Sequence, residues 1–276
     1  MRSIAIVAGQ EILVAMRNRW VLATTLIMAA LALSLTFLGS APTGQVGVDA
    51  LDVVIVSLSS LTIFLVPLIA LLIAHDAIVG EAERGTLPLL LSYSIGRRQV
   101  IIGKFLGHAF VLTIATAVGY GAAAAALALT GTEILRQSLM AFALMIGSSI
   151  LLGTAFIAIG YLISALARER ATAAGIAIAV WLLLVLVFDM ALLGILVVDQ
   201  GRTITAGVLD VLLLLNPTEV YRLFNLTGSG GVGQFSGMAG LAATATWSSV
   251  ALLAALVGWI LVPLSLATLA FARREV

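Results

Sequence analysis

Long apolar runs separated by short polar segments make up most of the chain. Six of these runs contain about 20 or more residues, the length that a helix needs to cross a hydrocarbon core about 30 Å thick. Helices are favoured there because lipid offers no partner for unpaired backbone N–H and C=O groups. We therefore predict an all-α membrane protein with six spans, at residues 20–39, 53–74, 105–129, 138–166, 172–198 and 249–271.

Two other stretches predict helices that do not span the membrane. Residues 204–215 are apolar but would extend only about 18 Å, so we expect a short helix at the outer surface. In residues 1–19, polar positions recur at spacings of seven and eight and share one helical face. This face carries Ser3, Gln10, Glu11, Arg17 and Asn18, and another carries Ile4, Val7, Ile12 and Met16. The pattern predicts an interfacial helix on the cytoplasmic surface.

Basic residues indicate the orientation of the spans. With the N-terminus in the cytoplasm, 11 of the 14 Lys and Arg residues fall in cytoplasmic segments, as the positive-inside rule requires. The exceptions are Arg136, Arg202 and Arg222. Six spans then place both chain ends in the cytoplasm. A cleaved signal peptide is the alternative for the first run, but the run is longer than a signal core and Pro42 follows the candidate cleavage point.

Composition narrows the range of functions. Hydrophobic residues make up 62% of the chain and charged residues only 10%, so its main solvent is lipid. A net charge of +1 gives no reason to expect a nucleic-acid partner. The chain has no cysteine, which excludes disulfides, thiolate metal sites and thiol nucleophiles.

Motifs for catalysis are also missing from the sequence. Gly228 and Gly233 have the separation found in phosphate-binding loops, but Gln234 and Phe235 stand where such a loop needs Lys and Ser or Thr. No zinc-ligand motif occurs in the sequence. We therefore expect a chain that is not an enzyme and binds no cofactor itself.

Three polar residues in or near the spans are candidates for function. Asp189 lies well inside the fifth span, where a charge is costly. It could belong to a proton or substrate path, or be a protonated or hydrogen-bonded carboxyl near Arg136 or Arg202. His75 and His108 could face one inner vestibule and bind a metal, but two imidazoles without thiolates make a weak site, so a structural role is favoured.

The segment between the second and third runs carries the most specific pattern. Residues 80–87 read GEAERGTL, leucines follow at 89–91, and Arg97, Arg98 and Lys104 precede the third run. This order resembles the intracellular coupling segment of ABC-2 type transporter permeases, where an acidic Gly-Thr-Leu element is followed by leucines and then by basic residues. Ser94 departs from the family pattern, which often has proline at this position.

The resemblance covers the whole chain and implies a fold and partners. The fold would be a single transmembrane domain over residues 1–276, similar to type V ABC exporters, with a cytoplasmic coupling segment at 77–103 and a periplasmic segment at 199–248. Two copies of the chain would pair and work with two ATPase subunits that hold ATP and Mg²⁺. The ATPase would dock on Glu81, Glu83, Arg84, Gly85, Thr86, Leu87, Leu89, Leu90, Arg97 and Arg98. A candidate second cytoplasmic contact is Arg168, Glu169 and Arg170.

The outer sequence LNPTEVYRLFNL at residues 215–226 narrows the resemblance to permeases of the complexes that mature the copper sites of nitrous oxide reductase. This implies a bacterial inner-membrane protein with a periplasmic copper-handling partner. That partner would dock on Asn216, Pro217, Glu219, Tyr221 and Arg222. Two alternatives stay open: an exporter of a lipid, drug or ion without a periplasmic partner, and a passive membrane anchor or scaffold.

Overall fold

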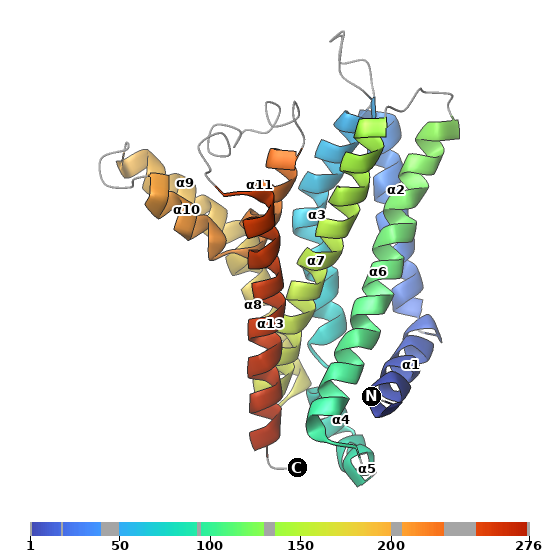
Figure 1. Ribbon diagram of the computed structural model, residues 1–276. Coiled ribbons are helices and arrows are strands. Elements are labelled where there is room, and N and C mark those ends of the chain that lie inside the picture. The colour runs from blue at the N-terminus through green and yellow to red at the C-terminus, as the bar shows by residue number, and fades with distance from the viewer. Residues whose placement is uncertain are drawn as a thin grey trace.

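The computed structural model describes residues 2–17, 19–39, 50–92, 95–129, 136–199, 206–228 and 247–274, and every regular element in these ranges is a helix (Figure 1). The long helices are α2 (Arg19–Gly39), α3 (Ala50–Ala74), α6 (Arg97–Leu129), α7 (Arg136–Leu166) and α13 (Ser249–Arg273). A further long helix is composite and consists of α8 (Arg170–Leu182), the π-helical turn η1 (Leu183–Val187) and α9 (Phe188–Asp199).

Five segments of the described chain are long and apolar enough to cross a membrane. They are Val54–Glu83, Arg97–Ala126, Ser138–Leu166, Arg170–Asp199 and Ser249–Arg273. They agree with five of the six predicted spans. The predicted first span corresponds to α2. Among the side chains of α2 that the structure describes, the apolar stretch is shorter and covers Ala23–Leu35. The chain is therefore a multi-pass helical protein, and the sixth crossing stays a prediction.

The centre of the bundle is α7, which lies against α3, α6 and α13. Glycines at the crossing points allow the helices to approach closely. A β-carbon at Gly160 would lie 2.6 Å from the Cβ of Ala74, and one at Gly153 would lie 2.4 Å from the Leu112 side chain. In their most apolar stretches, α3, α6 and α7 bury more than half of their residues, whereas α8–α9 and α13 bury less than a quarter. The last two segments therefore form the outer side of the bundle.

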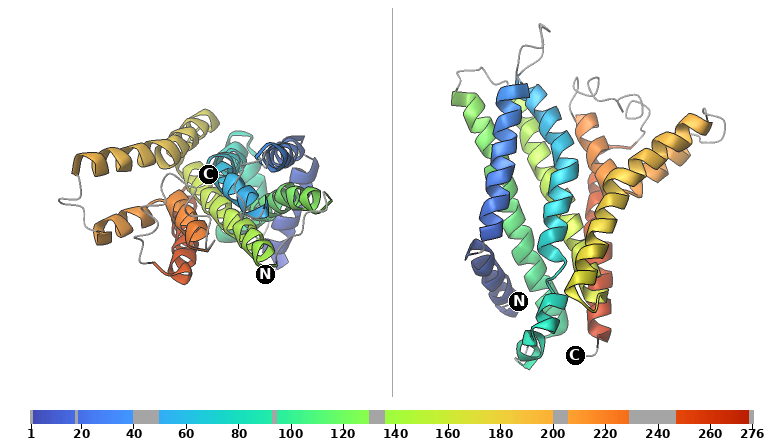
Figure 2. Two further views of the ribbon diagram at one scale, coloured as in Figure 1. Left: turned by 90° about the horizontal axis from the view of Figure 1, so that it is seen from above. Right: turned by 180° about the vertical axis from the view of Figure 1, so that it is seen from behind.

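The helix over residues 170–199 bends away from the other helices in its upper half (Figure 2). The bend occurs at η1, where the wider π-helical turn interrupts the regular α-helical ladder. Below the bend, the Trp181 indole N–H donates to the backbone carbonyl oxygen of Phe64 at 3.0 Å. This bond lies just before Pro67, whose missing N–H already weakens the ladder of α3.

Both chain termini lie at the same end of the bundle, which is the lower end in Figure 1. Three short helices are found there: α1 (Arg2–Arg17), which lies beside α6, and α4 (Val79–Glu83) and α5 (Thr86–Ser92), which follow α3. An even number of crossings would return the chain to its starting side in this way.

Two more short helices lie in the upper half of the bundle (Figure 1). The first is α10 (Ala206–Leu214), whose nine residues agree with the short non-spanning helix predicted at 204–215. The second is α11 (Pro217–Gly228), which packs against α13, α7 and α3 and was not predicted.

Candidate functional site

The segment predicted to be a coupling element forms a short helical hairpin at the lower end. Helix α4 ends at Glu83 and α5 begins at Thr86, and Gly85 between them has a φ of +68°, a conformation that glycine adopts without strain. The Thr86 hydroxyl donates to the backbone carbonyl oxygen of Glu81 at 3.2 Å and closes the turn. The tip of this α4–α5 hairpin is exposed, and Leu89 leaves 66% of its surface accessible.

The root of the hairpin is fixed to α7 and α8. The backbone N–H groups of Ile78 and Val79 both donate to the Ser164 hydroxyl, at 3.0 and 3.1 Å. The backbone N–H of Arg170 donates to a carboxylate oxygen of Glu83 at 2.7 Å, which caps the start of α8. The hairpin therefore has a free tip and an attached root.

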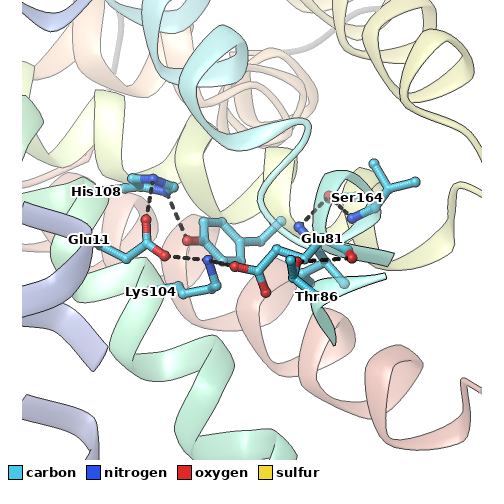
Figure 3. A network of polar contacts seen from close by, with 9 residues as sticks. Glu11, Glu81, Thr86, Lys104, His108 and Ser164 are labelled. Carbon is cyan, nitrogen blue, oxygen red and sulfur yellow. Dashed lines mark hydrogen bonds and ion pairs between the residues drawn. The ribbon is translucent and has the colours of Figure 1, made fainter. Parts of the chain in front are cut away.

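A buried network of charged and polar side chains joins the hairpin to α1 and α6 (Figure 3). The Lys104 ammonium, on α6, pairs with Glu11 of α1 and with Glu81 of α4, the latter at 2.7 Å. Only 6% of the Lys104 side chain is exposed. His108 lies one turn further along α6, with its Nε2 atom 3.5 Å from Glu11 and its Nδ1 atom 2.8 Å from the Tyr161 hydroxyl of α7. Four elements that are far apart in the sequence thus meet at one cluster.

The charge of Glu11 is well stabilised in this cluster. Burial alone raises the pKa of Glu11, but the hydrogen bond from His108 and the charge of Lys104 outweigh burial and lower the pKa to about 2. Glu11 is therefore ionised at any physiological pH. One oxygen of Glu81 is buried without a hydrogen-bond partner among the described residues. Lys104 is thus the group that offsets both carboxylates.

Helix α1 approaches α6 at two glycines. A β-carbon at Gly103 would lie 2.7 Å from the Cβ of Val7, and one at Gly107 would lie 2.6 Å from the Cβ of Glu11. Glu11 therefore faces α6, whereas Met16, on the predicted apolar face, is 74% exposed. The sequence pattern had placed Glu11 on a polar face, but its partners lie inside the protein.

The structure divides the predicted docking residues of the hairpin region into two groups. Exposed residues are Glu83, Arg84, Gly85, Thr86, Leu89 and Arg98. Leu87 is only 1% exposed, Leu90 is half-buried and Glu81 is held by Lys104. Docking on this segment stays a prediction, and the exposed group is the surface that a partner can reach.

Arg97 has a role inside the chain that the sequence did not indicate. Its guanidinium donates to the backbone carbonyl oxygens of Phe271, Ala272 and Arg274, at 3.2, 3.0 and 2.7 Å. Arg274 in turn donates to the carbonyl oxygen of Ser164 at 3.2 Å. Arg97 therefore ties the start of α6 to the end of α13, although we had expected it to dock a partner.

The predicted second contact lies next to the hairpin. Arg168 and Glu169 are exposed, while Arg170 pairs with Asp76 at 2.8 Å in a partly exposed ion pair. Arg168 and Glu169 also line the mouth of an open, mainly apolar groove between α7 and α8, with a volume of about 600 Å³. These residues and the hairpin form one continuous region at the lower end.

The two histidines have separate partners. His108 belongs to the Lys104 cluster, whereas a ring nitrogen of His75 lies 2.9 Å from the carbonyl oxygen of Leu72 in its own helix. Within the described ranges, no three His, Cys, Asp or Glu side chains are grouped so that they could hold a metal ion.

The residues predicted to dock an outer partner are mostly buried. Asn216 accepts a hydrogen bond from the backbone N–H of Thr218 at 3.0 Å, as a helix N-cap, and donates to the carbonyl oxygen of Leu184 in η1 at 2.6 Å. The Tyr221 hydroxyl lies 3.1 Å from that of Ser149. Pro217, Glu219 and Tyr221 are also buried, and Arg222 is half-buried. These side chains are used in contacts within the chain, and docking on them stays a prediction.

Comparison with known proteins identifies the class. The chain matches the family profile described as ABC-2 family transporter protein over residues 5–276, and it therefore belongs to that family. A permease of this family is non-catalytic, and the ATPase is a separate subunit.

Two bacterial relatives are similar over nearly their whole length. The chain is 46% identical to the probable ABC transporter permease protein NosY of Stutzerimonas stutzeri over 270 residues, which cover 97% of each protein. It is 45% identical to the protein of the same name from Pseudomonas aeruginosa over 276 residues, which cover 98% of each.

Proposed function

We propose that this chain is the membrane half of an ATP-driven complex that assembles the copper site of nitrous oxide reductase. In this proposal the chain crosses the bacterial inner membrane six times, with both termini and the α4–α5 hairpin in the cytoplasm. The concentration of 11 of the 14 Lys and Arg residues in the segments placed inside supports the orientation. The similarity to two probable NosY permeases supports the copper assignment, because the resemblance of residues 215–226 implies the same assignment.

The observation that carries the proposal is the α4–α5 hairpin with its free tip and attached root. The tip offers charged and apolar side chains, including Arg84 and Leu89, to a soluble partner. The root is joined to α1 and α6 through Lys104 and to α7 through Ser164. A passive anchor has no need for such an element, because nothing would move it.

In the proposed mechanism, an ATPase subunit binds the tip and moves it when ATP is bound and hydrolysed. The buried ion pair between Glu81 and Lys104 passes the displacement to α6, and Glu11 passes it to α1. A buried ion pair suits this role because separating its charges in a poorly solvated site is costly. The motion would then either export a substrate or act mechanically on a periplasmic partner. A second copy of the chain would complete the pathway.

The docking surface can be tested with exposed residues alone. We expect Arg84→Glu combined with Leu89→Asn to abolish copurification of the ATPase, because both side chains lie at the tip and neither contributes to the core. The matched control is Arg136→Glu with Leu215→Asn, which changes two exposed residues away from the lower end of the bundle. Copurification that survives the tip variant would exclude the hairpin as the docking site, and the control variant should retain the ATPase.

A periplasmic copper-handling protein is the other partner in this proposal. Since Asn216, Glu219 and Tyr221 are buried, we expect contact with exposed side chains of α10, such as Val208 and Val211. Replacement of both valines by Asn should release the copper-handling protein and leave the ATPase bound. An exporter without a periplasmic partner would instead retain no copper-handling protein before or after the change.

A further inference from the structure

The upper half of the bundle holds a second cluster of charges, formed by Asp189 on α9 and by Glu219 and Arg222 on α11. The Arg222 guanidinium donates to an Asp189 oxygen at 2.7 Å and to a Glu219 oxygen at 2.6 Å. The exposed fraction of the side chain is 2% for Glu219, 17% for Arg222 and 22% for Asp189. One guanidinium therefore faces two carboxyl groups at a poorly solvated site.

This cluster is unbalanced as it stands. Two carboxylates and one guanidinium leave a net charge of −1, which is expensive to keep out of water. The second oxygen of Asp189 is buried and receives no hydrogen bond from the described residues. Glu219 and Asp189 bind the two terminal nitrogens of the same guanidinium, so their carboxyl groups are neighbours. A proton between these two carboxyl groups would remove the net charge and supply the missing donor together.

We propose that Asp189, Glu219 and Arg222 form a proton-binding site, in which the two carboxyl groups share one proton and hold α11 against the bent helix. Binding adds a proton from the surrounding water and changes the charge of the cluster from −1 to zero. The site is a property of this chain, so the inference does not rest on the proposed role in copper-site assembly.

The surroundings of the cluster agree with this assignment. Burial raises the pKa of Glu219, Arg222 opposes this and Asp189 adds to it, so that the pKa is about 8. Glu219 therefore holds a proton at neutral pH.

Among the described residues, the other charged groups near α11 do not supply the missing positive charge. Asp210 of α10 is buried and has interactions of its own, and its charge has the wrong sign. Arg136 is exposed at the start of α7, and Arg273 ends α13. The side chain of Asp52, on α3, lies outside the described set. Among the described residues, Tyr221 is a further titratable neighbour, and it is hydrogen-bonded to Ser149.

The site lies where its charge can affect the fold. Asp189 follows η1 by two residues, and Asn216 at the start of α11 binds the Leu184 carbonyl oxygen within η1. Helix α11 is therefore held to the bent helix at two points, one of which can titrate. Loss of the proton above about pH 8 leaves a buried negative charge and weakens that point. Because the site lies in the upper half, the pH on that side of the membrane would govern its occupancy.

Infrared spectroscopy of the purified full-length chain can detect this proton directly. At pH 7 we expect the carbonyl stretch of one protonated carboxyl, which disappears with a midpoint at about pH 8. Glu219→Gln should remove the band, because the amide donates a hydrogen bond without titrating. Asp189→Asn should also remove it, since one carboxylate and one guanidinium balance without a proton. Glu169→Gln changes an exposed carboxyl at the lower end of the bundle; it is the matched control and should leave the band in place.

Three results would overturn the inference. The first is the lack of a protonated carboxyl in the wild type at pH 7. The second is a band that survives in both Glu219→Gln and Asp189→Asn. The third is a band that NaCl removes and choline chloride does not, because a metal cation would then take the place of the proton. If Glu219→Gln fails to fold, Asp189→Asn still decides the question.

Discussion

Two buried clusters in this chain each place one basic side chain between two carboxyl groups. At the lower end, Lys104 lies between Glu11 and Glu81, and in the upper half, Arg222 lies between Asp189 and Glu219. The composition is almost the same, yet the acids behave in opposite ways. The pKa of Glu11 is lowered to about 2, whereas that of Glu219 is raised to about 8.

The difference comes from the number of hydrogen-bond donors around each acid. In the lower cluster, His108 adds a donor to Glu11, and His108 is itself held by Tyr161. In the upper cluster, Glu219 has Arg222 on one side and a second acid on the other, so burial is not fully offset. One additional donor thus decides whether a buried carboxyl stays charged.

The two clusters also differ in what they connect. The lower one joins α1, α4, α6 and α7, and the pKa of Glu11 in it is lowered to about 2, which suits a permanent mechanical link. Among the described residues, the upper one joins α9 and α11, and it changes its charge near neutral pH, which suits a reversible link. Substitutions at matching positions can therefore test whether the lower cluster stabilises the fold both below and above about pH 8 and the upper cluster only below it.

The largest effect is expected for Lys104→Met. This change leaves two buried carboxylates without a base, and breaking a buried ion pair in this way costs about 3–5 kcal/mol. The measurement is thermal unfolding in detergent, followed by the fluorescence of the four tryptophans. Arg170→Met is the control, because its ion pair with Asp76 is partly exposed and should contribute about 1 kcal/mol or less. Equal losses for the two variants would contradict the rigid-link interpretation.

A smaller loss is expected for Gly107→Ala, which tests whether α1 belongs to the lower cluster. The added β-carbon would lie 2.6 Å from that of Glu11 and 3.0 Å from the carbonyl oxygen of Ala8, so α1 must move away. Overpacking of this kind costs about 1–3 kcal/mol. Gly121→Ala, on the same helix, meets nothing within 4 Å and should be neutral or slightly stabilising. A neutral Gly107→Ala would show that α1 can leave α6 at no cost.

Asn216→Ala tests the non-titrating attachment of α11. The variant loses the N-cap of α11 and the hydrogen bond to Leu184, for which we expect a loss of about 2 kcal/mol. Ser248→Ala removes only the exposed N-cap of α13 and should cost about 0.5–1 kcal/mol. If the two losses were the same, the bond from Asn216 to the π-helical turn would contribute nothing measurable to stability.

Much of the fold could be predicted because the signal in a membrane helix is its length. Five predicted spans agree with helices in the described chain, including the pair at 138–166 and 172–198 that only a short turn separates. The π-helical turn at Leu183–Val187 could not be predicted, since its residues are as apolar as their neighbours. Helix α11 could have been: Asn216, Pro217 and Glu219 stand at N-cap, N1 and N3, a typical helix start.

The candidate site was harder to predict because the sequence shows charges without their partners. The pattern at residues 80–104 indicated a coupling segment, but it did not separate the exposed Arg84 from Arg97, which binds backbone carbonyl oxygens of the C-terminal helix. Lys104 was recognised as part of that pattern, whereas Glu11 was assigned to a water-facing surface. Gly103 and Gly107 permit a close neighbour, but their spacing does not say which helix approaches. Such pairings depend on tertiary contacts between distant segments.

The smallest expected loss of stability separates the two clusters most cleanly, because the same change, Glu to Gln, is made in both. At pH 7 Glu11 is ionised, so Glu11→Gln should cost about 1–2 kcal/mol through a weaker bond to Lys104. Glu219 is protonated at pH 7 in the folded chain but would be ionised in the unfolded chain, so Glu219→Gln should be at least as stable as the wild type. Thermal unfolding of both variants beside the wild type gives the comparison.

The pH dependence of these two variants should have opposite signs. The pKa of Glu11 falls from 4.5 to about 2 on folding, so its stabilisation is present above pH 4.5 and is lost as the pH falls through 2. The pKa of Glu219 rises from 4.5 to about 8, so its stabilisation is fully present below pH 4.5 and is lost as the pH rises through 8. Glu219→Gln should therefore gain stability over the wild type as the pH rises from 4.5 to 8, and Glu11→Gln should approach the wild type in acid. Parallel profiles for the two variants would mean that the clusters do not differ in protonation, and the reversible attachment of α11 would have to be abandoned.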